Sequence, residues 1–169
     1  MKARLGEAGQ KRFQREFGAV SAVRYPHCIQ VLDLSVNCEV PYFTMELFRG
    51  APITSLRGQP LSLILQSIDQ AASAIDYVHA QGIIHRDVKP SNLLVRIEVD
   101  EHGKSSVETK LTDFGLARFT YAVSSLTERG GFVGTVLYGA PEQFANEMLD
   151  QRVDLYELLG KFRTVLWLS

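Results

Sequence analysis

His85-Arg86-Asp87-Val88-Lys89-Pro90-Ser91-Asn92 is the stretch that most constrains the fold and chemistry of this chain. It places an acid and a side-chain amide five residues apart within one short loop. Asp87 can accept a proton from a hydroxyl nucleophile, and a positioned base of this kind accelerates a reaction by about 10²–10⁴-fold. Asn92 offers an oxygen of the type that Mg²⁺ prefers. The stretch therefore predicts a base and a metal ligand on the same side of a loop.

Two further motifs follow in order, Asp113-Phe114-Gly115 and Ala140-Pro141-Glu142. Asp113 adds a second oxygen ligand for Mg²⁺. Taken alone, the first motif is typical of a turn and the second of a helix that begins with proline. A lone His85-Arg86-Asp87 would most often be surface charge. Their order and spacing together favour a single catalytic site over three unrelated pieces.

Hydrophobic periodicity predicts alternating helices and strands around these motifs. We expect helices over 10–23, 61–80 and 153–167, and strands over 29–35, 40–47, 93–95 and 110–112. The middle helix has the clearest inward stripe, which comprises Ile64, Ile68, Ala71, Ile75 and Val78, and Gly82 is expected to end it. We expect a break at 48–52, a loop at 98–106 and a long functional loop from Asp113 to Glu142.

Length and composition indicate one globular domain. The chain has 169 residues, and 46% of them are hydrophobic, which is enough for a core. Its formal charge of −1 excludes a nucleic-acid binder driven by bulk positive charge. Cys28 and Cys38 form no C-x-x-C pair, so neither a disulfide framework nor a zinc site is expected. We expect no membrane segment and no signal peptide, and hence a cytoplasmic location.

The chain resembles the eukaryotic-type protein kinases, and it looks closest to the bacterial serine/threonine kinases. The resemblance rests on the three motifs above and covers about Phe13 to Gly160. It implies an α+β, protein-kinase-like fold with a partial small sheet lobe and hinge over 1–48 and an incomplete helical lobe over 49–169. It also implies ATP and Mg²⁺ as cofactors and the Ser or Thr hydroxyls of a protein as the phosphoryl acceptor.

The resemblance assigns roles to individual residues. The implied catalytic residues are Asp87 as the base, Lys89 at the phosphoryl group and Thr135 near the base. Lys89 and Thr135 favour serine/threonine over tyrosine substrates. The implied magnesium ligands are Asn92 and Asp113, and the implied nucleotide-binding residues are Glu16, Met45, Glu46, Phe48 and Leu94, together with those two ligands. The resemblance further implies that Asp154 anchors the catalytic-loop backbone, and that Arg86 can pair with a phosphorylated Thr120, Ser124, Ser125 or Thr127.

The chain also departs from this family. It lacks the G-x-G-x-x-G and V-A-I-K strands that precede Glu16 in the family, and Glu142 has no evident arginine partner. The segment Asp154–Gly160 carries one residue more than the family pattern. These departures predict a domain truncated at both ends that is weak or inactive alone. The alternatives are a pseudokinase-like binding fragment and the product of a truncated gene.

Overall fold

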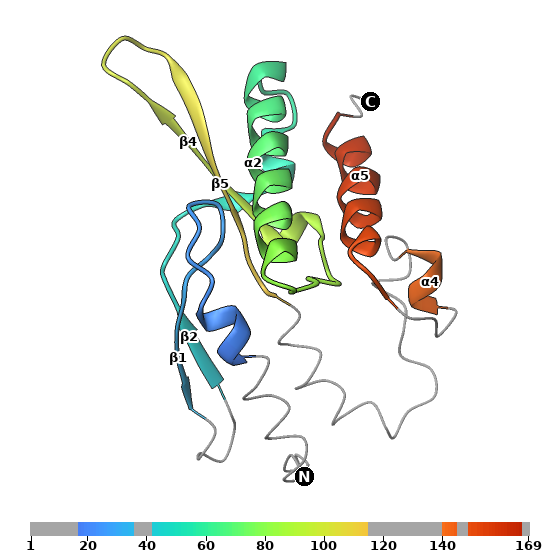
Figure 1. Cartoon of the computed structure of the whole chain (residues 1–169). Coiled ribbons are helices and arrows are strands. Elements are labelled where there is room, and N and C mark those ends of the chain that lie inside the picture. Colours follow the sequence, from blue (N-terminus) through green and yellow to red (C-terminus); the bar gives the residue numbers. More distant parts are fainter. Residues whose placement is uncertain (1–16, 36–41, 115–139, 145–148, 167–169) are drawn as a thin grey trace, which may run out of the picture.

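The computed structural model describes residues 17–35, 42–114, 140–144 and 149–166. Within these ranges the strands form two antiparallel sheets, one of β1 and β2 and one in the order β3-β4-β5. The strands are β1 (Val31–Ser35), β2 (Tyr42–Met45), β3 (Ala51–Pro52), β4 (Leu93–Val99) and β5 (Ser105–Leu111). The α-helices are α2 (Leu61–Ala80), α4 (Pro141–Phe144) and α5 (Arg152–Leu166), and 3₁₀ turns cover Ile53–Leu56 and Pro90–Asn92. Figure 1 shows α2 lying between the β4–β5 hairpin and α5.

The long helix α2 spans the residues that periodicity predicts. Four residues of the predicted inward stripe are buried, and Ile68 packs partly buried against the same core. The helix ends where Gly82 takes a left-handed conformation, with φ of 73°. The amides of Gly82 and Ile83 then donate to the carbonyls of His79 and Val78. This is a Schellman cap, which satisfies the last carbonyls of the helix and turns the chain toward the catalytic loop.

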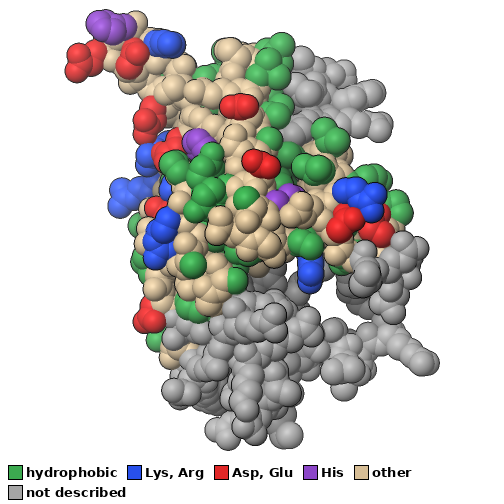
Figure 2. Space-filling model, viewed as in Figure 1, with side chains coloured by type: hydrophobic (Ala, Val, Ile, Leu, Met, Phe, Trp, Pro, Cys, Tyr) green, Lys and Arg blue, Asp and Glu red, His purple; other side chains and the backbone are tan. Residues whose placement is uncertain are grey.

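The β4–β5 hairpin is longer than periodicity predicts. Its strands pair continuously from Leu93 opposite Leu111 to Val99 opposite Ser105, so the predicted loop at 98–106 is wrong at both ends. The outer half is solvent-exposed: β4 alternates polar and apolar residues there, but its apolar residues Ile97 and Val99 are 38% and 64% exposed. An ion pair across the strands, at 2.6 Å between Arg96 and Glu108, supports it instead. Figure 2 shows both signs of charge interspersed along this projecting hairpin.

Three smaller sequence predictions need correction. The predicted break at 48–52 contains the short strand β3, which pairs with β4. The strands predicted over 29–35 and 40–47 are shorter, because β1 begins at Val31 and β2 ends at Met45. Of the helix predicted over 10–23, the structure describes residues from 17 onward, and these are helical to residue 21.

The edge of β5 that faces away from β4 pairs at Leu111 with the segment around Cys28, and polar side chains of α2 cover it at Val107 and Thr109. Gln70 donates to the Val107 carbonyl at 2.9 Å and accepts from the Thr109 amide at 2.8 Å. Gln66 accepts from the Val107 amide at 3.0 Å, and the Ser67 and Thr109 hydroxyls lie 2.8 Å apart. These bonds fix the height and rotation of α2 against the sheet, and so they fix where its C-terminal turn delivers the chain.

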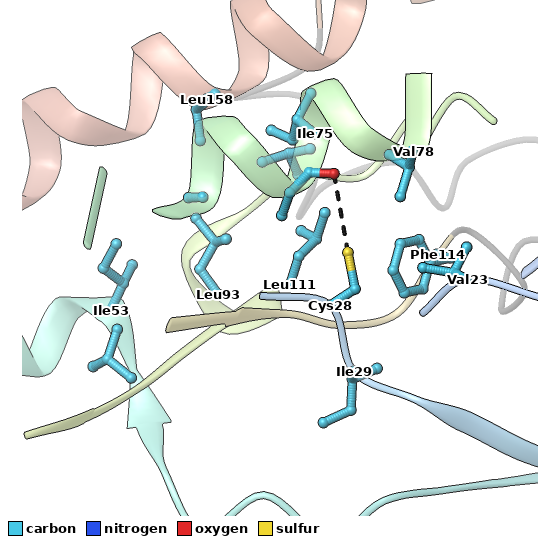
Figure 3. Packing of buried hydrophobic residues seen from close by; sticks show 14 of the residues in the cluster. Val23, Cys28, Ile29, Ile53, Ile75, Val78, Leu93, Leu111, Phe114 and Leu158 are labelled. Carbon is cyan, nitrogen blue, oxygen red and sulfur yellow. Dashed lines mark hydrogen bonds between the residues drawn. The ribbon is translucent and has the colours of Figure 1, made fainter. Parts of the chain in front are cut away.

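The core lies between α2, α5 and the three-stranded sheet (Figure 3), and its side chains include Ile53, Ile75, Leu93, Leu111 and Leu158. Cys28 lies within it, with its Sγ 3.9 Å from the Ala74 carbonyl oxygen. Burial raises the pKa of this thiol to about 12, although Lys110 opposes the shift. No helix within the described ranges is long and apolar enough to cross a membrane.

Candidate active site

Asp87, Lys89 and Asn92 meet in one hydrogen-bonded cluster. The ammonium of Lys89 donates to Oδ2 of Asp87 at 2.7 Å. The Asn92 amide nitrogen donates to the Asp87 carbonyl at 2.9 Å and to its Oδ2 at 3.2 Å. The 3₁₀ turn Pro90–Asn92 makes this closure possible, because it returns the chain toward Asp87. The Asn92 Oδ1 accepts a hydrogen bond from the Ser91 hydroxyl at 3.2 Å, and its second lone pair is the one that can ligate a cation.

Asp113 is held beside this cluster through its neighbour Thr112. The Thr112 amide donates to the Asn92 carbonyl at 2.9 Å, and the Thr112 carbonyl lies 2.9 Å from Nε2 of His85. Asp113 itself is exposed and has a φ of 59°. A non-glycine residue in this left-handed region is strained, and such strain gathers at functional sites. The arrangement brings the two predicted magnesium ligands onto adjoining segments, and both offer oxygen atoms, as Mg²⁺ requires.

His85 joins the catalytic loop to the segment that carries Asp113. Its side chain is 1% exposed, and burial lowers its pKa despite the opposing effects of Asp154, the Thr112 carbonyl, Asp87 and Asp113. The ring is therefore neutral. Its Nδ1 accepts from the Asp87 amide at 3.3 Å, so Nε2 carries the hydrogen that is donated to Thr112. One tautomer thus satisfies both contacts.

Asp154 on α5 anchors the backbone of the catalytic loop, as the sequence resemblance implies. It is fully buried and accepts from the His85 amide at 2.8 Å and from the Arg86 amide at 2.6 Å. Its Oδ2 also lies 2.7 Å from Nε2 of His79. Arg86 has a φ of 62°, so the carboxylate holds a strained turn directly before Asp87. The pairing of His79 with Asp154 was not predicted from the sequence.

Sequence reasoning also missed two further contacts to the loop. Glu157 accepts from the Val88 amide at 2.6 Å, and Gln143 of α4 donates to the Arg86 carbonyl at 3.3 Å. Glu157 lies three residues after Asp154, on the same face of a helix, and this spacing was the available signal. Gln143 carried no periodic or charge signal.

The predicted adenine-binding residues lie around Lys110 on β5. Its ammonium donates to Glu46 at 2.8 Å and lies 5.8 Å from the centre of the Phe48 ring. Burial tends to raise the pKa of Glu46, but the hydrogen bonds from Lys110 and from the Gln30 amide outweigh it and lower the pKa. Lys110 pairs directly with Leu94 on β4. The structure thereby links Glu46, Phe48 and the strand of Leu94 through one side chain.

The remaining predicted site residues are placed as follows. Met45, which is 40% exposed, ends β2 and pairs with Val31. Glu16 and Thr135 lie outside the described residues. In the described part of the chain, no three residues of His, Cys, Asp and Glu cluster as a metal site. The candidate ligands Asn92 and Asp113 instead suit a magnesium ion that completes its coordination with water and phosphate oxygens.

The sequence of this chain matches a known protein family and several characterised relatives. The family described as "Protein kinase domain" matches residues 1–159. The serine/threonine-protein kinase Pkn1 of Myxococcus xanthus is 35% identical over 150 residues, which cover 88% of this chain and 21% of that protein. The DNA damage-responsive serine/threonine-protein kinase RqkA of Deinococcus radiodurans is 37% identical over 161 residues, covering 91% and 23%. The chain thus spans less than a quarter of the length of these two relatives.

The fold of this chain is also similar to that of a solved structure. The crystal structure of the Mycobacterium tuberculosis PknI kinase domain, as a C20A_R136A double mutant, superposes with a TM-score of 0.70 at 23% identity. The alignment covers 95% of this chain and 58% of the other. At this identity the likeness concerns the fold alone. It confirms the partial α+β arrangement that the sequence predicts.

Proposed function

Because the chain belongs to the protein kinase family, we propose that it carries the phosphoryl-transfer centre of a serine/threonine protein kinase. In this proposal residues 1–48 belong to the small lobe and hinge, and residues 49–169 to the helical lobe. The reaction transfers the γ-phosphoryl group of ATP to a Ser or Thr hydroxyl of a protein. The observation that carries the proposal is the cluster of Asp87, Lys89 and Asn92, built on a loop that buried carboxylates hold in place.

The geometry supports a role for each side chain. The hydroxyl oxygen attacks the γ-phosphorus, the bond to the bridging oxygen of ADP breaks, and the hydroxyl proton passes to the Asp87 carboxylate. Lys89, whose ammonium lies 2.7 Å from that carboxylate, brings a positive charge to the site and can neutralise charge on the transferred group. Asn92 and Asp113 would hold Mg²⁺, which when bound supplies positive charge against the phosphate oxygens. The protein contributes mainly alignment, since this chemistry needs little covalent help.

We further assign nucleotide binding to Glu16, Met45, Glu46, Phe48 and Leu94, and a place near the base to Thr135. For Glu46 the support is its double attachment, to Gln30 on one side and to Lys110 on the other. This fixes the segment that would meet the adenine edge. For Phe48 and Leu94 the support is their position around the same lysine.

We also propose that Arg86 receives a phosphorylated side chain from residues 115–139. Its Nε is buried and has no hydrogen-bond partner among the described residues. A buried guanidinium nitrogen without an acceptor is destabilising, and a phosphate oxygen would satisfy it. Thr120, Ser124, Ser125 and Thr127 all lie within that segment.

The test is phosphate transfer from ATP to a generic protein substrate such as casein, measured with the protein that contains this chain. Asp87→Asn keeps the size of the side chain and removes the base, so we expect a loss of at least about 10²-fold in kcat. Asp76→Asn, on the exposed face of α2, is the matched control and should retain full activity. Asp87→Asn activity within threefold of the unmodified protein would refute the proposed role of Asp87.

A further inference from the structure

We propose that Glu157 is a positioning residue for Asp87, and that it acts with Asp154 as a two-carboxylate clamp on the catalytic loop. The inference rests on the proposed function, since it names the second support of the same site. It concerns the buried acid in the segment where the sequence departs from the family pattern. In that segment the Glu157 carboxylate accepts a hydrogen bond from the catalytic loop.

The clamp consists of two carboxylates on one face of α5. Asp154 and Glu157 are three residues apart, and they are 0% and 2% exposed. Asp154 accepts from the amides of His85 and Arg86, and Glu157 accepts from the amide of Val88 at 2.6 Å. The backbone donors on both sides of Asp87 are therefore held by one helix.

The burial of Glu157 and Val88 indicates that the hydrogen bond between them has a specific role. An ionised carboxylate in a protein interior is unfavourable unless hydrogen bonds compensate it. A side chain that only fills space at position 157 would be apolar, as at Leu158 in the same turn, which is 4% exposed. Val88 is itself fully buried, so its amide has no water to replace a lost acceptor. The contact therefore pairs a buried donor with a buried acceptor.

The consequence for the site follows from the strain before Asp87. Arg86 is left-handed, so the peptide between Arg86 and Asp87 is held in a conformation that other backbone contacts must maintain. Asp154 restrains that peptide from the N-terminal side alone. Glu157 restrains the first amide on the C-terminal side, so the direction of the Asp87 side chain is set from both ends. Loss of Glu157 should let Asp87 shift while the rest of the fold remains.

The first experiment follows amide hydrogen exchange of Val88 by NMR, which requires no catalytic activity. In Glu157→Ala we expect exchange of Val88 at least tenfold faster than in the unmodified protein, with His85 and Arg86 less affected. Glu157→Gln retains an acceptor oxygen and should preserve most of the protection. Val153→Ala is the control, because it also removes buried atoms from α5 but none of these hydrogen bonds involves its side chain. If Val88 exchanges equally fast in Glu157→Ala and Val153→Ala, the inference is overturned.

The second experiment measures kcat and KM for ATP in the same variants of the protein that contains this chain. Misplacing a reacting group can lower a rate by about 10²-fold, so Glu157→Ala should lower kcat by about tenfold or more with KM within twofold. Glu157→Gln should restore most of kcat, and Val153→Ala should retain it. Equal kcat in Glu157→Ala and Val153→Ala refutes the positioning role. An unmodified protein without transfer activity refutes the proposed function instead, and the exchange experiment still decides whether the clamp exists.

Discussion

Replacing Asp154 by alanine should be among the most damaging single changes in the helical part of this fold. The carboxylate is fully buried, and it accepts two backbone amides and lies 2.7 Å from a ring nitrogen of His79. Removing it leaves these donors without their acceptor in the interior. It also releases the strained turn at Arg86, which has a φ of 62°. The predicted effect is a loss of stability that is concentrated at the catalytic loop.

The magnitude can be estimated from the contacts. A hydrogen bond to a charged group contributes about 1.5–3 kcal/mol, and the two backbone amides of His85 and Arg86 both lose such an acceptor. We therefore expect Asp154→Ala to lower the free energy of unfolding by about 3–5 kcal/mol. Asp154→Asn keeps one oxygen for the Arg86 amide but turns an NH₂ group toward the His85 amide. It should lower the free energy by about 1–3 kcal/mol.

Urea denaturation followed by circular dichroism measures the difference. With a slope near 2 kcal/mol/M, a loss of 4 kcal/mol moves the midpoint by about 2 M. Glu98→Ala serves as the control, because it removes a carboxylate whose ion pair with Arg96 lies on the exposed hairpin and should contribute little. If Asp154→Ala shifts the midpoint no more than Glu98→Ala, the anchor role derived from the structure is wrong.

Three further outcomes follow from the titrating groups. Burial places the folded-state pKa of His85 below its ordinary value of 6.5, so on acidification the unfolded chain binds a proton before the folded chain does. The free energy of unfolding should therefore be highest above about pH 6.5 and decline below it. Urea denaturation at pH 7.5 and 5.5 should show a smaller decline in His85→Leu, and an equal decline would argue against this linkage. Lys110→Met should raise the pKa of the Glu46 carboxyl toward 4.5 in an NMR titration, since it removes the side-chain hydrogen bond, and an unchanged pKa would contradict that contact. Cys28, with a pKa of about 12, should resist alkylation by iodoacetamide at pH 8 until urea unfolds the protein. Peptide mass spectrometry measures the labelling, and rapid labelling of the folded protein would exclude such burial.

The features that the sequence predicted correctly are those in which local pattern and tertiary structure agree. Helix α2 has an unbroken apolar stripe and a glycine with a left-handed φ at its end, so its bounds could be read directly. The cluster of Asp87, Lys89 and Asn92 lies within one short loop, where spacing already limits the geometry. The anchor role of Asp154 came from family resemblance, and its hydrogen bonds confirm it.

The features that were missed depend on pairing between distant segments. The outer half of the β4–β5 hairpin buries no apolar face, since Ile97 and Val99 are exposed, and cross-strand contacts such as that between Arg96 and Glu108 stabilise it. Glu157 was missed although its spacing of three residues from Asp154 places the two carboxylates on one face of α5. Its partner Val88 is 69 residues away in sequence, and no local pattern reports such a contact.

The glutamines that cover β5 have a consequence for association between chains. An edge strand with unpaired amides and carbonyls is a template onto which another strand can add, by domain swapping or in a fibril. At Val107 and at the Thr109 amide, Gln66 and Gln70 already occupy those groups with side-chain amides, which imitate the donors and acceptors of a neighbouring strand. Nδ1 of His27 lies 3.1 Å from the Thr109 carbonyl. Side chains of a helix thereby cover this edge at Val107 and Thr109, and the segment around Cys28 pairs with it at Leu111. Growth by strand addition along this edge would first require α2 to detach, and the core beneath α2 opposes that.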